Sequence, residues 1–206
     1  MDYPQNATSE EKSIDWVKIA EISDQDFGFT DLVEKSSETR FNTRILLTNE
    51  KDEICVIKSK KHGYTQIPGG GIEDDESILD GLRRETEEET GYLIDNIKPI
   101  GYVIEHRESA QNHHSWNRCI SYVFTATPSQ DVGTKYMPDE IEEGFTPVWV
   151  SLESLVEAKK QVFKDGTIDN YNGNFSNLRD LYLAEYYLDW LKNNRKELKG
   201  GQNEKQ

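Results

Sequence analysis

The sequence has little cysteine and no long apolar run. Its 206 residues include only 2 cysteines, Cys55 and Cys119, which is too few for a disulfide framework or a cysteine-based zinc site. No stretch approaches the roughly 18 consecutive apolar residues of a transmembrane helix, and residues 1–13 lack the basic and apolar regions of a signal peptide. We therefore expect a cytoplasmic protein without a membrane partner, in which both thiols are buried and inert.

Basic residues are scarce relative to acidic ones. Lys and Arg number 24 against 39 Asp and Glu, so the formal net charge is −15. A surface with this charge repels phosphate backbones over most of its area, so we expect neither DNA nor RNA binding. A chain of this length buries roughly 70% of the surface that its unfolded form exposes, and it forms a core without disulfides. The composition indicates one acidic globular domain, which would need cations to handle polyphosphates.

Hydrophobic patterning predicts one mixed α/β domain between polar ends. Strands are expected at 16–22, 41–47, 54–57, 97–105, 119–126 and 146–150, and helices at 77–90, 152–163 and 176–193. The polar turn at 49–52 predicts a hairpin of the second and third strands. Strands interleaved with one central helix favour a mixed sheet flanked by helices. The expected organisation is a disordered lead-in, a main domain, C-terminal helices packed on that domain and a frayed tail, at residues 1–14, 15–150, 151–197 and 198–206.

Three glutamates of the predicted helix 77–90 lie where negative charge is costly. On a helical wheel, Glu85 and Glu89 fall on the face of the apolar residues, and Glu88 lies at its edge. All three lie just before the stop at Gly91, at the end of the helix where its dipole is negative, and a half-buried carboxylate without a partner costs several kcal/mol. The neighbouring Arg84 supplies only one positive charge. The cluster therefore needs a further cation, and an all-oxygen ligand set favours Mg²⁺ or Mn²⁺.

The turn before this helix is rich in glycine. Without side chains, Gly69, Gly70 and Gly71 let the backbone approach a metal ion or a phosphate closely. A carboxylate-bound metal beside such a turn can polarise a phosphoryl group and ionise a water molecule. The alternative, an acidic solvated helix that follows a turn, conflicts with the inward direction of the glutamates.

The segment from Gly70 to Tyr92 resembles the signature of the Nudix hydrolase family. That signature reads Gly, five residues, Glu, seven residues, Arg-Glu, an aliphatic residue, any residue, Glu-Glu, any residue, Gly and an aliphatic residue. All seven fixed positions are matched, by Gly70, Glu76, Arg84, Glu85, Glu88, Glu89 and Gly91. Thr86 and Tyr92 stand where the family has aliphatic residues, which affects packing more than chemistry.

The resemblance implies both a fold and an activity. The fold is an α/β/α sandwich around a mixed sheet, here with extra C-terminal helices. The reaction is metal-dependent hydrolysis of the pyrophosphate linkage in a small nucleoside diphosphate derivative, with Mg²⁺ or Mn²⁺ as cofactor. By the same resemblance, Glu85, Glu88 and Glu89 bind the metal with the Gly69 or Gly70 carbonyl, and one of these acids or a loop acid activates water. Arg84 orients a glutamate, and Glu76 braces the loop or assists the metal at longer range.

Further site residues are expected outside the signature. A loop acid often completes such sites in this family, and we expect Glu142 or Glu143 in this role, with a solvated acidic loop as the alternative. Arg40 and Arg44, on a predicted core strand, are candidates for binding a substrate phosphate. The backbone of Gly70 and Gly71 is expected to contact the substrate.

Other functions stay open at this point. A module that binds a nucleotide metabolite without cleaving it is the main alternative, although such family members usually have damaged glutamates. An isomerase of diphosphate substrates would need a catalytic cysteine, and Cys55 and Cys119 are poorly placed for it. The aromatic residues of helix 176–193 are interpreted as core packing, with a homodimer surface as the alternative. The residues that mark ADP-ribose and dinucleoside polyphosphate hydrolases are absent from positions 108–110, so the substrate is not specified.

Overall fold

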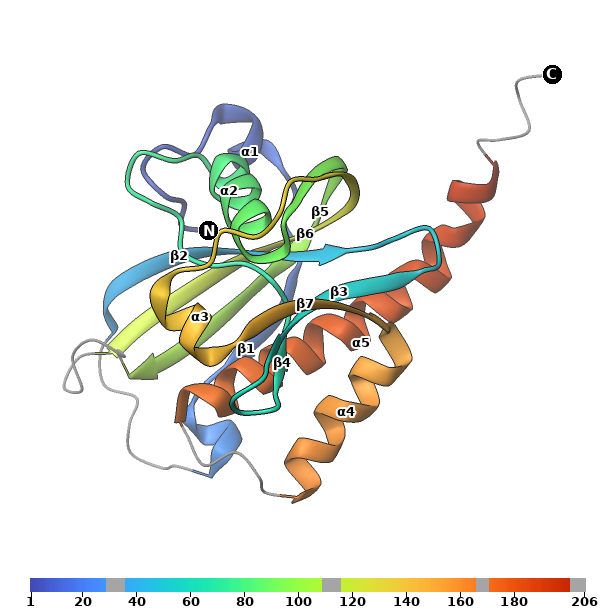
Figure 1. Cartoon of the computed structure of the whole chain (residues 1–206). Helices are drawn as coiled ribbons and strands as arrows, with labels where there is room; N and C mark the ends of the chain where they lie inside the picture. Colours follow the sequence, from blue (N-terminus) through green and yellow to red (C-terminus); the bar gives the residue numbers. More distant parts are fainter. Residues whose placement is uncertain (29–35, 109–115, 166–170, 201–206) are drawn as a thin grey trace.

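The protein is built around a four-stranded mixed sheet with the strand order β1-β5-β6-β2 (Figure 1). The computed structural model describes residues 1–28, 36–108, 116–165 and 171–200. The four strands are β1 (Lys18–Ile22), β2 (Ser36–Leu47), β5 (Tyr92–Glu108) and β6 (Trp116–Asp131). β5 and β6 pair antiparallel, whereas β1 pairs with β5 and β2 with β6 in parallel. The mixed sheet expected from the sequence is confirmed.

A second, smaller sheet has the order β4-β3-β7. Its strands are β3 (Glu53–Ser59), β4 (Thr65–Gln66) and β7 (Phe145–Ser151), all paired antiparallel. The predicted hairpin between β2 and β3 forms only at its turn, where the Asn49 N–H donates to the Glu53 carbonyl at 3.0 Å. Beyond a single bridge, from Thr48 to Ile54, the two strands enter different sheets. The hairpin prediction was wrong beyond that bridge because β3 pairs along its whole length with β7.

Helices cover both faces of the four-stranded sheet. α2 (Ile78–Thr90) lies on one face, and α4 (Leu152–Asp165) and α5 (Tyr171–Gly200) lie on the opposite side in Figure 1. One core joins Ile78 and Leu82 of α2 to the sheet, and the other joins Leu183 of α5 to it. Two short helices, η1 (Asp24–Phe27) and α3 (Pro138–Glu143), lie in connecting segments. The expected α/β/α layering is confirmed.

The N-terminal segment differs from the disordered lead-in expected for residues 1–14. It contains α1 (Ser9–Ser13), which Thr8 and Glu11 stabilise with reciprocal capping hydrogen bonds. Glu11 is only 2% exposed, and its Oε1 accepts the Leu79 N–H of α2 at 2.8 Å. A polar segment is therefore ordered here, because its one buried carboxylate satisfies a free amide in the first turn of α2.

The aromatic residues of α5 contribute to the core, as interpreted from the sequence. Tyr187 is 3% exposed, and its hydroxyl lies 2.7 Å from Thr125 Oγ1 and 3.1 Å from Thr48 Oγ1. Residues 201–206, part of the expected frayed tail, lie outside the described residues. No helix in the described part of the chain is both long enough and apolar enough to cross a membrane.

Candidate active site

Helix α2 presents its acidic residues next to an apolar face, as the wheel predicts. Ser77 caps its first turn and Gly91 ends it in the left-handed conformation with φ 76°, so both expected boundaries are confirmed. Ile78, Leu82 and Thr86 are fully buried against the sheet. Thr86 thus packs where the family signature has an aliphatic residue, and its hydroxyl donates to a carbonyl of the preceding turn.

Glu89 is the most deeply buried acid of the cluster. It is 6% exposed, and its Oε2 accepts the Gly69 N–H at 2.7 Å. Burial raises the pKa of Glu89 to about 8, although the Gly69 N–H and the nearby Arg44 favour the ionised form. Near neutral pH the metal-free protein therefore holds a proton on this carboxyl for most of the time.

Arg84 binds three glutamates at once, rather than the single one expected. Its Nε and Nη2 donate to the two oxygens of Glu76 at 2.6 and 2.9 Å, and its Nη1 donates to Glu85 at 2.8 Å and Glu88 at 3.1 Å. Nη2 also donates to the Gly71 carbonyl at 2.8 Å. The hydrogen bond from Arg84 lowers the pKa of Glu76, whereas burial raises that of Glu85 despite the same guanidinium. Arg84 therefore ties the helix to the glycine turn.

The glycine turn runs beside β2, and its glycines at positions 69 and 70 leave room for two different neighbours. The Thr43 N–H donates to the Gly70 carbonyl at 2.9 Å, which aligns the turn with the strand. Gly69 has φ 130°, and a Cβ there would collide with the Thr43 carbonyl. A Cβ at Gly70 would collide with the carboxylate of Glu85. Glycine at position 70 thus leaves the space in which the Glu85 carboxylate lies against the turn.

Of the two arginines expected to bind phosphate, only Arg44 reaches this turn. Its Nη1 donates to the Gly69 carbonyl, and its buried Nε has no hydrogen-bond partner among the described residues. Burial lowers the pKa of Arg44 to about 10, with the charge of Arg179 acting in the same direction and that of Glu89 opposing it. Arg40 is exposed, and no hydrogen bond or ion pair within the described residues joins it to the glutamates.

The two acids expected to complete the site, Glu142 and Glu143, lie near basic side chains of the turn that follows β3. The Glu142 side chain is 78% exposed and pairs with Lys61 at 3.1 Å, and Glu143 lies 3.2 Å from His62 Nε2. The acid of this segment whose charge acts on Glu89 is Glu140. Since residues two apart point to nearly opposite sides of a helix, α3 turns Glu142 outward. Pro138, at the first position of α3, is the sequence signal for this helix.

Tyr136 was missed by the sequence analysis. Its hydroxyl is buried without a hydrogen-bond partner in the described part of the chain. Burial raises the pKa of Tyr136, and so does the charge of Glu89, which places the two groups near one another. A buried hydroxyl in a native protein normally has a partner, so this atom is available to a bound water or ligand. No short motif marks Tyr136, because only the fold brings it to Glu89.

The donor set fits a hard divalent ion, although its members are now engaged with one another. Within residues 1–28, 36–108, 116–165 and 171–200, no three His, Cys, Asp or Glu side chains are arranged as a metal site. Arg84 holds Glu85 and Glu88, and the Gly69 amide holds Glu89. Carboxylates and a peptide carbonyl are the ligands that Mg²⁺ prefers. Because the pKa of Glu89 is raised, a bound cation would compete with protonation of this carboxyl.

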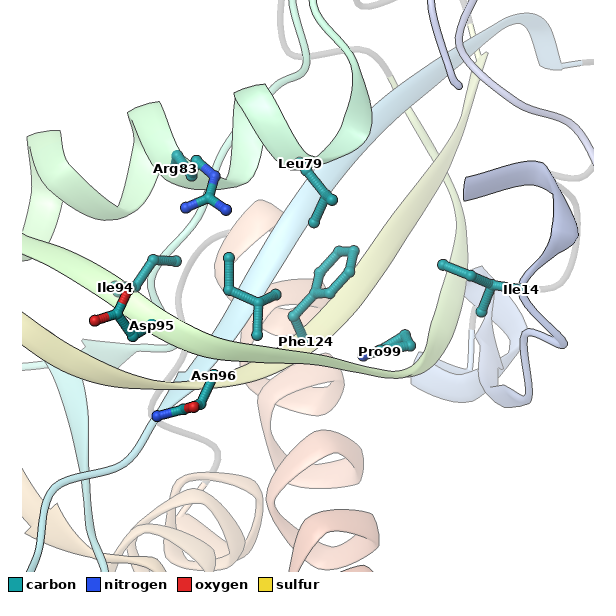
Figure 2. A pocket seen from close by; sticks show the side chains of 9 residues that line it. Ile14, Leu79, Arg83, Ile94, Asp95, Asn96, Pro99 and Phe124 are labelled. Atoms are coloured by element: carbon teal, nitrogen blue, oxygen red, sulfur yellow. The ribbon is translucent and has the colours of Figure 1, made fainter. Parts of the chain in front are cut away.

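A separate cavity of about 330 Å³ lies beside α2, away from this cluster (Figure 2). Leu79 and Arg83 of α2 project over Ile94 and Phe124 of the sheet. Arg83 lies on nearly the opposite side of the helix from Glu85. The cavity is therefore not part of the candidate site.

Comparisons with known proteins agree with these features. A family model described as NUDIX domain matches residues 38–171. An RNA pyrophosphohydrolase of Ruthia magnifica subsp. Calyptogena magnifica is 41% identical over 146 residues, covering 61% of this chain and 78% of the relative. The 8-oxo-dGDP phosphatase NUDT18 of Mus musculus is 31% identical over 110 residues, covering 52% of this chain and 31% of the relative.

Solved structures give weaker similarity. The MutT protein from Methanosarcina mazei Go1 matches with 21% identity and a TM-score of 0.46, covering 78% of this chain and 99% of that chain. A MutT protein from Bacillus halodurans matches with 24% identity and a TM-score of 0.46, covering 61% and 80%.

Proposed function

Because the chain belongs to the NUDIX family, we propose that it hydrolyses the pyrophosphate linkage of a small nucleoside diphosphate derivative, with Mg²⁺ or Mn²⁺ as cofactor. The family match confirms the expected class of enzyme, a hydrolase of phosphoanhydride bonds. The observation that carries the finer proposal is the position of Glu89. It is a buried carboxylate held by the Gly69 amide, and its neighbour Glu85 lies against Gly70.

The metal ion would be held by the three glutamates of α2. Glu85, Glu88 and Glu89 supply carboxylate oxygens, the Gly69 carbonyl supplies a peptide oxygen, and Glu76 assists at longer range. When bound, the ion would neutralise phosphate charge and lower the pKa of a water molecule. Arg84 orients the glutamates and the turn through its contacts with Glu76, Glu85 and Gly71.

Two further residues complete the proposed site. We assign to Glu140 the role first expected of Glu142, because the charge of Glu140 acts on Glu89 while Glu142 is exposed. Arg44, rather than Arg40, is the proposed phosphate ligand, since its buried Nε is free of protein partners in the described residues. The backbone of Gly70 and Gly71 would also contact the substrate, in addition to Arg44.

A small nucleotide fits the charge of the protein better than a nucleic acid. With a formal net charge of −15, most of the surface repels a long phosphate backbone. The relatives named RNA pyrophosphohydrolase and 8-oxo-dGDP phosphatase nevertheless put 5′-triphosphorylated RNA and 8-oxo-dGDP among the substrates to test. A cytoplasmic location and a homodimer stay predictions.

The deciding experiment is a product-resolved hydrolysis panel with Mg²⁺ and with Mn²⁺. It contains nucleotide sugars, ADP-ribose, dinucleoside polyphosphates, normal and oxidised nucleoside di- and triphosphates, and 5′-triphosphorylated RNA. We expect cleavage at a pyrophosphate bond of a small nucleotide, and loss of that activity in Glu88→Gln. The matched control is Glu87→Gln, one residue away on α2, where Glu87 pairs with Lys135 at 2.6 Å. If nothing is cleaved while a nucleotide raises the melting temperature, the chain is a binding module instead.

A further inference from the structure

A group of charged side chains from the C-terminal helices is buried beneath the four-stranded sheet. Asp180 and Arg179 of α5 are 0% and 2% exposed, and Lys159 of α4 is 4% exposed. Glu105 of β5 is also fully buried. None of these residues belongs to the Nudix signature, and the role proposed above for the glutamates does not use them.

Asp180 connects the other members of this network. Its Oδ1 accepts hydrogen bonds from Arg179 Nε at 3.1 Å and Nη2 at 2.9 Å. Its Oδ2 lies 3.2 Å from Lys159 Nζ and accepts the Ile67 N–H at 3.0 Å. Arg179 Nη1 lies 3.6 Å from Glu105 Oε2. One carboxylate therefore joins α4 and α5 to the backbone of residue 67.

The backbone that this network holds leads directly into the glycine turn. Lys159 Nζ donates to the Thr65 carbonyl at 2.5 Å, and Asp180 accepts the Ile67 N–H. Pro68 follows, with its φ restrained by the ring, and then Gly69, whose N–H donates to Glu89. A single residue, Pro68, thus separates the amide held by Asp180 from the amide that meets Glu89, the most buried acid of the site.

Solvent cannot take the place of Asp180 as the hydrogen-bond acceptor of the Ile67 N–H. Ile67 is 0% exposed, so a water molecule cannot replace Asp180 as the acceptor of its N–H. Buried ion pairs are poor sources of stability, because well-packed apolar residues of the same volume often do as well or better. The hydrogen bonds of a buried ion pair do fix the direction of the groups bound to it. In this network those groups are the Ile67 N–H and the Thr65 carbonyl, which lie beside the site.

We propose that Asp180 and Lys159 are positioning residues for the metal-binding turn. They hold residues 65–67, and thereby direct the Gly69 amide toward Glu89, one of the residues that would hold the metal. The C-terminal helices α4 and α5 thereby help to position the active site, in addition to packing against the sheet. This inference rests on the proposed function, because it concerns the metal site assigned there.

The test compares full-length variants of neighbouring ion pairs on the same two helices. Asp180→Asn offers one acceptor oxygen where the carboxylate has two, so either Ile67 or Arg179 loses its acceptor. Lys159→Met keeps the apolar stem but removes the donor to Thr65. The control is Glu185→Gln, because Glu185 pairs with Lys160 at 2.7 Å between α4 and α5 and its side chain is 41% exposed.

Two readouts are independent of turnover. Mn²⁺ affinity is measured by electron paramagnetic resonance, and amide hydrogen exchange of Ile67 and Gly69 is measured by NMR. We expect Asp180→Asn and Lys159→Met to weaken Mn²⁺ binding by about 10-fold or more, as residues behind metal ligands commonly do, and to accelerate exchange at Gly69. Glu185→Gln should match the wild type in both readouts.

The inference is overturned if folded Asp180→Asn or Lys159→Met binds Mn²⁺ within twofold of the wild type and Gly69 exchange is unchanged. If Asp180→Asn does not fold, Lys159→Met decides alone. If the wild type itself does not bind Mn²⁺, the proposed function fails, and exchange at Ile67 and Gly69 then decides whether the helices position the turn.

Discussion

Charged side chains are buried on both faces of the four-stranded sheet, but they are balanced on only one. On the α5 face, Arg179 and Lys159 meet Asp180 and Glu105, two charges of each sign. On the α2 face, Glu76, Glu85 and Glu88 share the single guanidinium of Arg84, whereas Glu89 accepts the Gly69 N–H and has Arg44 as its nearby cation. The ion pairs of the α5 network balance one another and the nearby Arg44 adds a positive charge, although both Glu105 oxygens lack a hydrogen-bond partner within the described residues. The unbalanced cluster needs a proton or an external cation, which is the electrostatic signature of a metal site.

The pKa values express the same difference. On the α2 face, burial dominates and raises the pKa of Glu89 to about 8. On the α5 face, burial alone would raise the pKa of Asp180, but Arg179, Lys159 and the Ile67 N–H outweigh it and hold the pKa below its ordinary value. Burial therefore determines the pKa of Glu89 on the α2 face, whereas neighbouring positive charges determine that of Asp180 on the α5 face.

The largest expected effect is on turnover, from Glu89→Gln. We expect a decrease of at least about two orders of magnitude, because a metal ligand is lost. The metal-free fold should be intact or more stable at pH 8, since a glutamine still accepts the Gly69 N–H without a charge. Steady-state kinetics with Mg²⁺ and thermal melting without metal check this, with Glu87→Gln as the control. If Glu89→Gln has the turnover and the metal affinity of the wild type, Glu89 is not a metal ligand.

Removing the central acid of the α5 face should have the largest effect on stability. Asp180→Ala leaves Arg179 and Lys159 buried without their carboxylate, which is expected to cost about 3–5 kcal/mol in the free energy of unfolding. Glu185→Ala removes one partner of a partly exposed ion pair between α4 and α5, and it should cost less than about 1 kcal/mol. Urea denaturation measures both. Equal losses would show that the buried network is no more than an ordinary surface pair.

The pH dependence of stability should differ between the two faces. The folded pKa of Glu89 is above that of the unfolded chain, so between about pH 4.5 and 8 the native state binds the extra proton. The free energy of unfolding of the metal-free protein should therefore fall as pH rises through this range, by at most about 1.4 kcal/mol per pH unit.

Asp180 acts in a different pH range and with the opposite sign. Its folded pKa is below the ordinary value, so its contribution is present at neutral pH and is lost as pH falls through that lowered pKa in the acid range. Saturating Mg²⁺ should reduce the change in the free energy of unfolding with pH near neutrality, because the ion replaces the proton on Glu89. It should also raise the melting temperature. Denaturation from pH 4 to 9, with and without Mg²⁺, tests this. A neutral slope that persists in Glu89→Gln would contradict the assignment.

The smallest expected effect separates two acids of α3. Glu142→Gln should change turnover by less than about twofold, because that side chain is exposed and pairs with Lys61. Glu140→Gln should lower turnover by about tenfold or more, as expected for an acid that assists proton transfer. Steady-state kinetics of the two variants test this prediction. A larger loss of turnover in Glu142→Gln than in Glu140→Gln would identify Glu142 as the loop acid.

The local chemistry of the site was predictable from the sequence. The boundaries of α2 and the inward direction of Glu85 and Glu89 follow from helical periodicity, and the glycine run before the helix allows a close approach of the backbone. These features depend on residues within about 25 positions of one another, so neighbouring side chains and the backbone decide them. The Nudix signature is readable for the same reason.

Only the tertiary structure decided which distant residues meet this segment. Arg44 reaches the Gly69 carbonyl because the turn pairs with β2, and Tyr136 and Glu140 approach Glu89 because the chain after β6 returns over α2. Asp180 is separated from Ile67 by 113 positions, yet it holds that amide. Such contacts depend on the packing of sheets and helices against one another, and no local pattern in the sequence encodes them. The sequence by itself therefore determined the acidic helix and its glycine turn, whereas the fold determined what holds them in place.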